Sequence, residues 1–266
     1  MPDEQGESVK LTIDGKEVVA EAGTTVLEAV RQQGIDIPAL CCHPVLGGAG
    51  ACKLCVVEIV TDDERKVKTS CTNKVREGMQ VLTDSKEVTK ARQAAISELL
   101  ARAPAAKVVQ ELAKDYGVSE PASEPADSEA RCILCGQCVR TCKKLIEVGA
   151  IGFSGRGKER KVSTPDDIES ATCLACGACF NLCPTGNIRM RDGAKSRNML
   201  TWHTEVDWST CSECGEAYSL STRLVEHLKK KKPDSAELLE VCPSCRRGNT
   251  AKSLVKAAGL GEEDEG

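Results

Sequence analysis

Aromatic residues are scarce in this sequence, since Phe, Trp and Tyr together make up 2% of its 266 residues. Large aromatic side chains usually dominate a hydrophobic core, so other groups must help to hold the chain together. The sequence also lacks an apolar run long enough to span a bilayer, and it lacks the basic and apolar regions of a secretory signal. Secretion and membrane insertion are therefore unsupported, and we expect a cytoplasmic protein.

An excess of positive charge is absent as well. The 36 Lys and Arg residues against 40 Asp and Glu residues leave a net charge of −4, which does not indicate a nucleic-acid-binding protein. Cysteine, by contrast, is abundant, with 17 residues. In a reducing compartment, so many cysteines are more typical of metal binding than of a disulfide framework.

The N-terminal part of the sequence predicts a small sheet packed on one helix. Apolar and polar residues alternate from Val9 to Ala20 around an Asp14-Gly15 turn signal, which predicts a β-hairpin. Thr25 and Glu28 have the spacing of a capping box, which predicts a helix that ends near Gly34. Short strands are expected at residues 56–60, 67–69 and 79–82, and this order suits a β-grasp sheet.

The first group of cysteines has ten, two and fifteen residues between its successive members, and four thiolates can complete a [2Fe–2S] cluster. The glycine-rich loop 47–50 precedes the close pair, where missing side chains let backbone N–H groups approach the sulfur atoms. The alternative is a flexible turn beside buried free thiols, but two more cysteines at compatible spacing favour a cluster. The predicted ligands are Cys41, Cys52, Cys55 and Cys71.

An internal repeat carries the strongest signal. The run C-x-x-C-x-x-C-x-x-x-C occurs at residues 132–142 and again at 173–183, and in two-cluster ferredoxins the fourth cysteine of each run serves the other cluster. Zinc is the alternative for a lone pair of cysteines, but eight ligands in two equivalent runs favour two [4Fe–4S] clusters. We expect Cys132, Cys135, Cys138 and Cys183 at the first cluster and Cys142, Cys173, Cys176 and Cys179 at the second.

Two C-x-x-C pairs lie in the C-terminal segment, Cys211 with Cys214 and Cys242 with Cys245, on either side of a helix expected from Leu220 to Lys230. Such pairs suit a tetrahedral tetrathiolate site, and a structural zinc ion is our leading assignment. A further iron–sulfur cluster or a rubredoxin-like iron stays open, because soft thiolates bind zinc and iron–sulfur species alike. Four groups of four cysteines leave one spare thiol, Cys42.

Several of these motifs resemble a known family. The segments Ile37–Pro44, Gly50–Glu58, Ser70–Cys71 and Glu77–Met79 resemble the N-terminal iron–sulfur region of the large iron–sulfur subunit of respiratory complex I, and so does the thirty-residue insertion between Cys142 and Cys173. The resemblance covers about residues 8–193. It extends to iron–sulfur subunits of NAD-reducing hydrogenases, formate dehydrogenases and electron-bifurcating complexes.

The resemblance also marks departures from the family pattern. In the family, a His and three Cys bind an additional [4Fe–4S] cluster, but residues 100–107 here contain neither residue type, so we expect that cluster to be absent. Cys42 stands where relatives commonly carry another residue. We expect His43 to pack or hydrogen-bond rather than to bind iron, because four cysteines are already in place.

The resemblance implies an electron-transfer subunit, without a substrate site of its own, in a soluble NAD(P)-linked complex. The implied partners are a flavin- and NAD(P)-binding subunit that resembles the NADH-binding subunit of complex I, and a second redox subunit. Electron bifurcation and the choice between NAD and NADP stay open. Two other functional hypotheses also stay open: a free, multi-cluster ferredoxin-like carrier, and a zinc-dependent structural or binding module.

The expected fold class is α+β, and the expected cofactors are one [2Fe–2S] cluster, two [4Fe–4S] clusters and one zinc ion. A helical stretch should end at Pro104, and residues 119–128 should form a solvated linker. Four parts are expected along the chain. They are a β-grasp [2Fe–2S] ferredoxin domain at residues 8–85, a helical segment and linker at 86–128, a two-cluster [4Fe–4S] ferredoxin-like domain at 129–195, and a four-cysteine, zinc-ribbon-like domain at 200–260.

Overall fold

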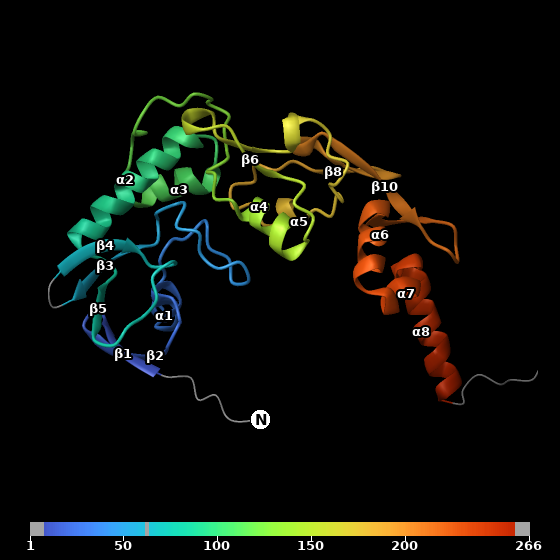
Figure 1. The fold of residues 1–266 in the computed structure, drawn as a ribbon, viewed down its shortest axis with the longest axis horizontal. Coiled ribbons are helices and arrows are strands. Elements are labelled where there is room, and N and C mark those ends of the chain that lie inside the picture. The colour runs from blue at the N-terminus through green and yellow to red at the C-terminus, as the bar shows by residue number, and fades with distance from the viewer. Residues whose placement is uncertain (1–7, 62–63, 259–266) are drawn as a thin grey trace, which may run out of the picture. The chain divides into compact units, whose positions relative to one another are not determined.

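The computed structural model describes residues 8–61 and 64–258, and the chain divides into two compact units (Figure 1). The first unit comprises residues 1–145, 153–162 and 179–187, and the second comprises residues 146–152, 163–178 and 188–266. Among the helices of the described residues, none is both long enough and apolar enough to cross a membrane.

The first unit begins with the predicted hairpin of β1 (Ser8–Ile13) and β2 (Lys16–Glu21). Asp14 and Gly15 both have positive φ, at 47° and 82°, as a two-residue hairpin turn requires. β3 (Val56–Thr61), β4 (Glu64–Thr69) and β5 (Met79–Leu82) complete a five-stranded sheet in the order β2-β1-β5-β3-β4. β1 and β5 are parallel, and the other neighbouring strands are antiparallel.

The predicted N-terminal helix packs on this sheet. α1 (Val26–Gln32) starts with the predicted capping box, in which the Thr25 side chain accepts from Glu28 N and the Glu28 carboxylate accepts from Thr25 N. Val26 and Val30 are fully buried in the same core as strand residues of the sheet. Each such aliphatic side chain stabilises the fold by about 1.5–3 kcal/mol, so the small unit has a core of its own despite its few aromatic residues.

Two helices form a second core in this unit. α2 (Lys86–Arg102) ends before Pro104, as predicted, and α3 (Lys107–Asp115) follows after a short turn. Ala103 and Ala106 in this turn are fully buried, and they share an apolar cluster with Cys41 and Cys52. The cysteine loops therefore pack directly on this pair of helices.

Short elements follow along the chain: α4 (Gln137–Arg140), the π-helical η1 (Thr141–Leu145), β6 (Gly152–Ser154), β7 (Lys161–Ser163) and α5 (Ala178–Asn181), with 3₁₀ turns at Gly157–Glu159 and Pro165–Asp167.

The second unit contains a four-stranded antiparallel sheet in the order β11-β10-β9-β8. Both tryptophans of the chain, Trp202 and Trp208, are buried here, and Trp208 Nε1 donates to Gly193 O at 2.9 Å.

The predicted C-terminal helix begins at Thr222 rather than Leu220, because Leu220 still belongs to β11 and Ser221 caps the helix. The elements are β8 (Arg191–Asp192), β9 (Ser196–Met199), a 3₁₀ turn (Leu200–Trp202), β10 (Thr204–Thr210), β11 (Ala217–Ser221), α6 (Thr222–Lys231), a 3₁₀ turn (Pro233–Ser235), α7 (Ala236–Glu240) and α8 (Pro243–Ala257).

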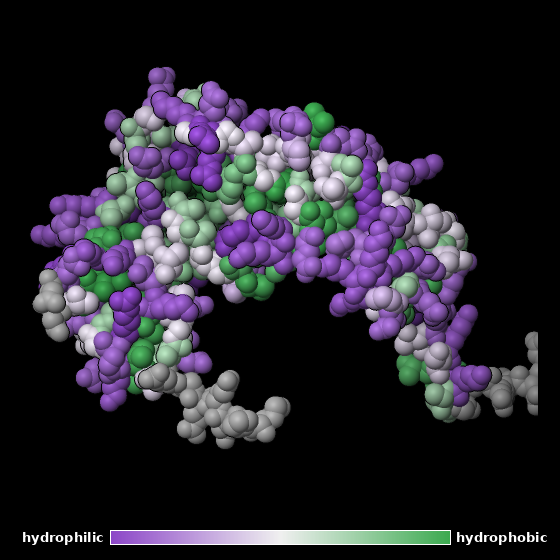
Figure 2. Space-filling model, in the orientation of Figure 1, coloured by the Kyte–Doolittle hydropathy of each residue, from purple (hydrophilic) through white to green (hydrophobic). Residues whose placement is uncertain are grey.

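Hydrophilic residues cover most of the face shown in Figure 2, and hydrophobic residues lie there in small, separate patches. Leu238 and Leu254, on α7 and α8, are among the most exposed large apolar side chains, at 58% and 65%. Scattered apolar residues of this kind are normal on a protein surface and do not indicate a membrane-binding face.

Candidate iron–sulfur and metal centres

The four cysteines of the first group come together in the first unit. Each is at most 3% exposed, and a chain of thiol contacts runs from Cys52 to Cys41, from Cys41 to Cys71 and from Cys71 to Cys55. Cys52 N also donates to Cys41 Sγ at 3.5 Å. Hydrogen bonds from the Cys52 and Cys71 thiols lower the pKa of Cys41, and one from Cys71 holds the pKa of Cys55 at about 6. The same thiol contacts raise the pKa of Cys52 and Cys71, so a metal that binds here must displace protons from these two thiols.

The spare thiol and the neighbouring histidine lie beside this group. Burial raises the pKa of the Cys42 thiol, which packs against the apolar core of the sheet. His43 makes a hydrogen bond, as predicted: its Nδ1 accepts from Val45 N at 3.2 Å.

Arg92 and Ser70 hold the backbone around Cys55, and no sequence pattern predicts this role for either residue. Arg92 on α2 is 5% exposed, and its guanidinium donates to Leu54 O, Val56 O and Thr83 O at 2.9–3.3 Å. Ser70 donates to Cys55 O through both its N–H, at 2.9 Å, and its hydroxyl, at 2.6 Å. Three successive carbonyls at Cys55 are therefore satisfied.

The first four-cysteine set of the repeat also lies within the first unit. Three of its members belong to residues 132–138, and Cys183 returns to them from the segment 179–187. Cys183 is close enough to raise the pKa of Cys132 and Cys135 electrostatically, in addition to the larger effect of burial, which brings Cys135 to about 11. Burial likewise raises the pKa of Cys138. A metal that binds here must displace protons from these thiols.

The two halves of the repeat share an unusual backbone. Leu134 and Ala175 occupy equivalent places in the two runs and both have positive φ, at 52° and 48°. Gly136 and Gly177 follow at 69° and 76°. A Leu or Ala in this left-handed region is strained, so the common conformation indicates a common ligand-binding turn.

The second set of the repeat is divided between the two units. Cys142 and Cys179 belong to the first unit, and Cys173 and Cys176 belong to the second. Within the second unit, Arg197 Nη1 donates to Ala175 O at 3.3 Å, which holds the turn before Cys176. The shared ligand set of these four cysteines stays a prediction from the sequence.

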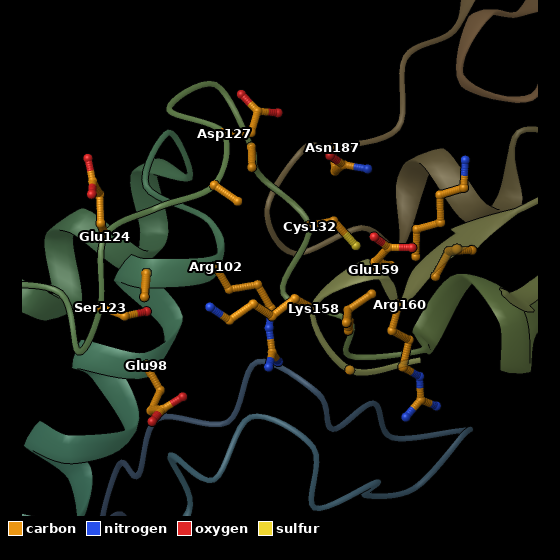
Figure 3. A pocket seen from close by; sticks show the side chains of 17 residues that line it. Glu98, Arg102, Ser123, Glu124, Asp127, Cys132, Lys158, Glu159, Arg160 and Asn187 are labelled. Carbon is orange, nitrogen blue, oxygen red and sulfur yellow. The ribbon is translucent and has the colours of Figure 1, made fainter. Parts of the chain in front are cut away.

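Two adjoining hollows in the first unit border the ligand loops. The larger has a volume of about 740 Å³ and is lined by Cys132, and Figure 3 shows Arg102 and Lys158 reaching into it. The smaller, of about 480 Å³, lies between Ala49 of the first cysteine loop and Cys135. Its charged lining residues are Arg102, Arg140 and Arg160, with no carboxylate. Positive charge therefore borders Cys135, whereas the larger hollow is also lined by the carboxylates of Glu98, Glu124, Asp127 and Glu159.

The C-terminal cysteines form the tightest group. Their Sγ atoms all lie within 4.8 Å of one another, and Cys214 Sγ stands 3.9 Å from Cys242 Sγ. A tetrahedral Zn²⁺ with Zn–S bonds of about 2.3 Å separates its sulfurs by about 3.8 Å. The spacing of these four sulfur atoms is compatible with one tetrahedral metal ion. No other group of three or more metal-ligating residues in the described ranges is this compact.

The local structure of this group also suits thiolates. The first pair follows β10, whereas the second pair opens α8, where Cys242 N donates to Cys211 Sγ at 3.2 Å and Cys245 N to Cys242 Sγ at 3.4 Å. Backbone N–H groups of Cys242 and Cys214 hold the pKa of Cys211 at about 6. A helix N-terminus stabilises thiolate in addition.

Three buried polar side-chain atoms of the described residues have no hydrogen-bond partner, and all three flank candidate ligands. They are Arg140 Nε and Thr141 Oγ1, between Cys138 and Cys142, and Arg246 Nε, next to Cys245. Buried donors normally find a partner, so their placement fits sites where sulfur atoms accept hydrogen bonds. The cysteine sets, the glycine loops and these donors thus fit iron–sulfur sites and a four-cysteine metal site.

Comparisons with known proteins agree with this arrangement. Residues 6–86 match the family described as a 2Fe-2S iron-sulfur cluster binding domain, and residues 131–187 match a 4Fe-4S dicluster domain. The alpha subunit of a NADPH-Fe(3+) oxidoreductase from Geobacter sulfurreducens is 30% identical over 203 residues, which are 68% of this chain and 24% of the relative. The mitochondrial 78 kDa subunit of the NADH-ubiquinone oxidoreductase from Candida albicans is 30% identical over 203 residues, 67% of this chain and 28% of the relative.

A solved structure is similar too. The NAD+-reducing [NiFe]-hydrogenase in its H2-reduced state contains a chain that is 28% identical, with a TM-score of 0.58, over 68% of this chain and 86% of that one. This chain spans about a quarter of the length of the curated relatives that it matches. It is an iron–sulfur protein with a [2Fe–2S] domain and a [4Fe–4S] dicluster domain, related to the iron–sulfur subunits of complex I-type oxidoreductases and NAD-reducing hydrogenase.

Proposed function

We propose that this chain is an electron-transfer subunit that passes single electrons between other redox subunits of a NAD(P)-linked oxidoreductase complex. The observation that carries the proposal is the packing of Cys41 and Cys135 in one apolar cluster of the first unit, because they belong to two different ligand sets. Iron–sulfur clusters, when bound, accept and release one electron at a time. Loops that hold two such sites side by side would allow an electron to pass from one cluster to the other.

The ligand assignment is part of the proposal, with the domain boundaries given above. Cys41, Cys52, Cys55 and Cys71 would hold a [2Fe–2S] cluster in a β-grasp domain. One [4Fe–4S] cluster would take Cys132, Cys135, Cys138 and Cys183, and the other would take Cys142, Cys173, Cys176 and Cys179. Cys211, Cys214, Cys242 and Cys245 would hold a structural Zn²⁺, with which the spacing of their sulfur atoms is compatible.

The partners follow from the relatives. Their names describe NADPH- or NADH-linked oxidoreductases and a NAD+-reducing hydrogenase, so a flavin- and NAD(P)-binding subunit and a second redox subunit are the proposed donor and acceptor. The hollows beside Cys132 and Cys135 are where a partner's redox group would come nearest to the first four-iron site. A cytoplasmic location belongs to the same proposal.

Metal and sulfide analysis after anaerobic purification tests this function, together with low-temperature EPR of the reduced protein. We expect about ten iron atoms, from one [2Fe–2S] and two [4Fe–4S] clusters, and one zinc ion. About fourteen iron atoms without zinc would make the C-terminal site a further relay centre. A colourless protein that contains only zinc would refute the electron-transfer function.

A further inference from the structure

Arg140 lies in the first run of the repeat, but its side chain binds the loop of the other ligand set. Its Nη2 donates to Cys41 O at 2.8 Å, and its Nη1 donates to Leu46 O at 2.9 Å and to Gly47 O at 3.1 Å. A guanidinium presents several donors in a rigid plane, so one side chain can hold carbonyls on both sides of a turn. Arg140 thereby joins the 132–142 run to the loop that begins at Cys41.

Gln137 makes a parallel connection one helical turn earlier. It is 5% exposed, and its Nε2 donates to Leu40 O at 2.7 Å. Arg140 and Gln137 together hold the carbonyls of two consecutive residues, Leu40 and Cys41. Cys135, two residues before Gln137, packs in the apolar cluster that contains Cys41. Largely part-buried hydrogen bonds and apolar contacts therefore hold the two loops in one arrangement.

No negatively charged side chain among the described residues balances the positive charge of Arg140. Its three hydrogen bonds go to neutral carbonyls, no carboxylate in the described ranges forms an ion pair with it, and its Nε is buried without a partner. A half-buried cation is costly unless negative charge lies nearby. Thiolate-bound clusters carry net negative charge, which grows by one unit on reduction, and Arg140 stands between two of their candidate sites.

We propose that Arg140 is a positioning residue shared by the [2Fe–2S] site and the first [4Fe–4S] site, where it sets their separation and its charge favours the reduced form of both. Gln137 shares the positioning role but not the charge. The inference rests on the proposed function, because it requires clusters at both cysteine sets. The step concerned moves one electron: one site is oxidised by one electron, the other is reduced by one, and no bond or proton changes.

Three substitutions separate charge from position in the full-length, cluster-loaded protein. Arg140→Gln removes the positive charge and the guanidinium hydrogen bonds. The reduction potentials of the [2Fe–2S] site and the first [4Fe–4S] site should therefore fall, and the magnetic interaction between the two reduced clusters should weaken. Arg140→Lys keeps the charge but loses the rigid fork, so the interaction should weaken while both potentials change little. Gln137→Met should weaken the interaction without lowering the potentials. Arg76→Gln removes an exposed arginine charge from the same unit and serves as the matched control.

Redox titration followed by EPR, with relaxation measurements on the fully reduced protein, gives both readouts. Unchanged potentials and unchanged interaction in Arg140→Gln, relative to Arg76→Gln, would overturn the proposal. If Arg140→Gln does not bind its clusters, Arg140→Lys and Gln137→Met provide the test. An unchanged magnetic interaction between the reduced clusters in both of these variants would overturn the proposed positioning role. Absence of cluster signals from the wild-type protein would instead refute the proposed function itself.

Discussion

Gly48 and Cys71 are in such close contact that a Cβ on Gly48 would lie 2.5 Å from Cys71 Cβ and 2.7 Å from its Sγ. Glycine is needed here for space, because backbone and a candidate ligand would both have to move. Gly48→Ala should therefore displace Cys71 and lose the [2Fe–2S] signal, while the [4Fe–4S] signals persist. EPR and iron analysis check this.

Gly152→Ala is the matched control for this substitution, since an added Cβ there meets no atom within 4 Å. It should keep every cluster. If Gly48→Ala kept a native [2Fe–2S] spectrum, the ligand role of Cys71 would be in doubt.

Arg92 should be a stability determinant of the first unit. Arg92→Met leaves the carbonyls of Leu54, Val56 and Thr83 without their donor, and each buried, unsatisfied carbonyl costs about 1–3 kcal/mol. The free energy of unfolding of this unit should fall by roughly 3 kcal/mol or more. Denaturant titration monitored by cluster absorbance measures it. Lys90→Met, on the same helix with its side chain 71% exposed, should have little effect.

Cys42 should be dispensable for cluster binding, although it is next to a candidate ligand. Its thiol packs against the core of the sheet, and burial raises its pKa, so it is held as a neutral group. Cys42→Ala should keep the full iron content, whereas Cys41→Ala should lose the two iron atoms of the [2Fe–2S] cluster. Equal losses of iron in both variants would show that the ligand set is misassigned.

The metal at the C-terminal cysteines should be released by acid. Backbone N–H groups hold the pKa of Cys211 at about 6, and a hydrogen bond with Cys242 raises that of Cys245, so protons compete with the metal most strongly at Cys245. Metal binding displaces protons from these thiols, so metal retention should increase as pH rises and decrease as pH falls. Zinc release to a chromogenic chelator measures this.

Cys214→Ala should abolish zinc binding without changing the iron content, because Cys214 belongs only to the compact group of four. Loss of iron from this variant would argue for a cluster at this site.

The arginines of the smaller hollow should attract anionic redox reagents. Arg102 and Arg160 are exposed, and no carboxylate forms an ion pair with either among the residues described. Arg102→Gln combined with Arg160→Gln should slow oxidation of the reduced protein by ferricyanide several-fold at low ionic strength. Oxidation by the cation hexaammineruthenium(III) should not slow. The control is Arg65→Gln combined with Arg76→Gln, because both of these arginines are also exposed in the first unit.

Much of the first unit could be predicted from the sequence because its signals are local. The Asp14-Gly15 turn and the Thr25 and Glu28 capping box depend on residues at most three positions apart, and each lies where it was expected. The cysteine sets are predictions of the same local kind, since the spacing of metal ligands is a property of the chain itself, and the ligand assignment stays a prediction. The C-terminal helix was placed two residues early, because Leu220 is apolar and suits a strand end equally well.

The residues that support the ligands could not be found in this way. Arg92 contacts carbonyls 36 and 38 positions away, and Arg140 contacts carbonyls more than 90 positions away. Neither arginine has a sequence pattern that distinguishes it from surface arginines on a short helix. The opening of α8 at Cys242 was missed for a similar reason, since Cys242-Pro243 looks like a turn as well as a helix start.

Both tryptophans, Trp202 and Trp208, are buried in the second unit, and the first unit has none. Intrinsic tryptophan fluorescence will therefore report unfolding of the second unit alone. A thermal melt followed by this emission could look complete while the first unit, with its five-stranded sheet, is still folded. The absorbance of a [2Fe–2S] cluster, whose four candidate ligands all belong to the first unit, would provide the separate optical probe for that unit.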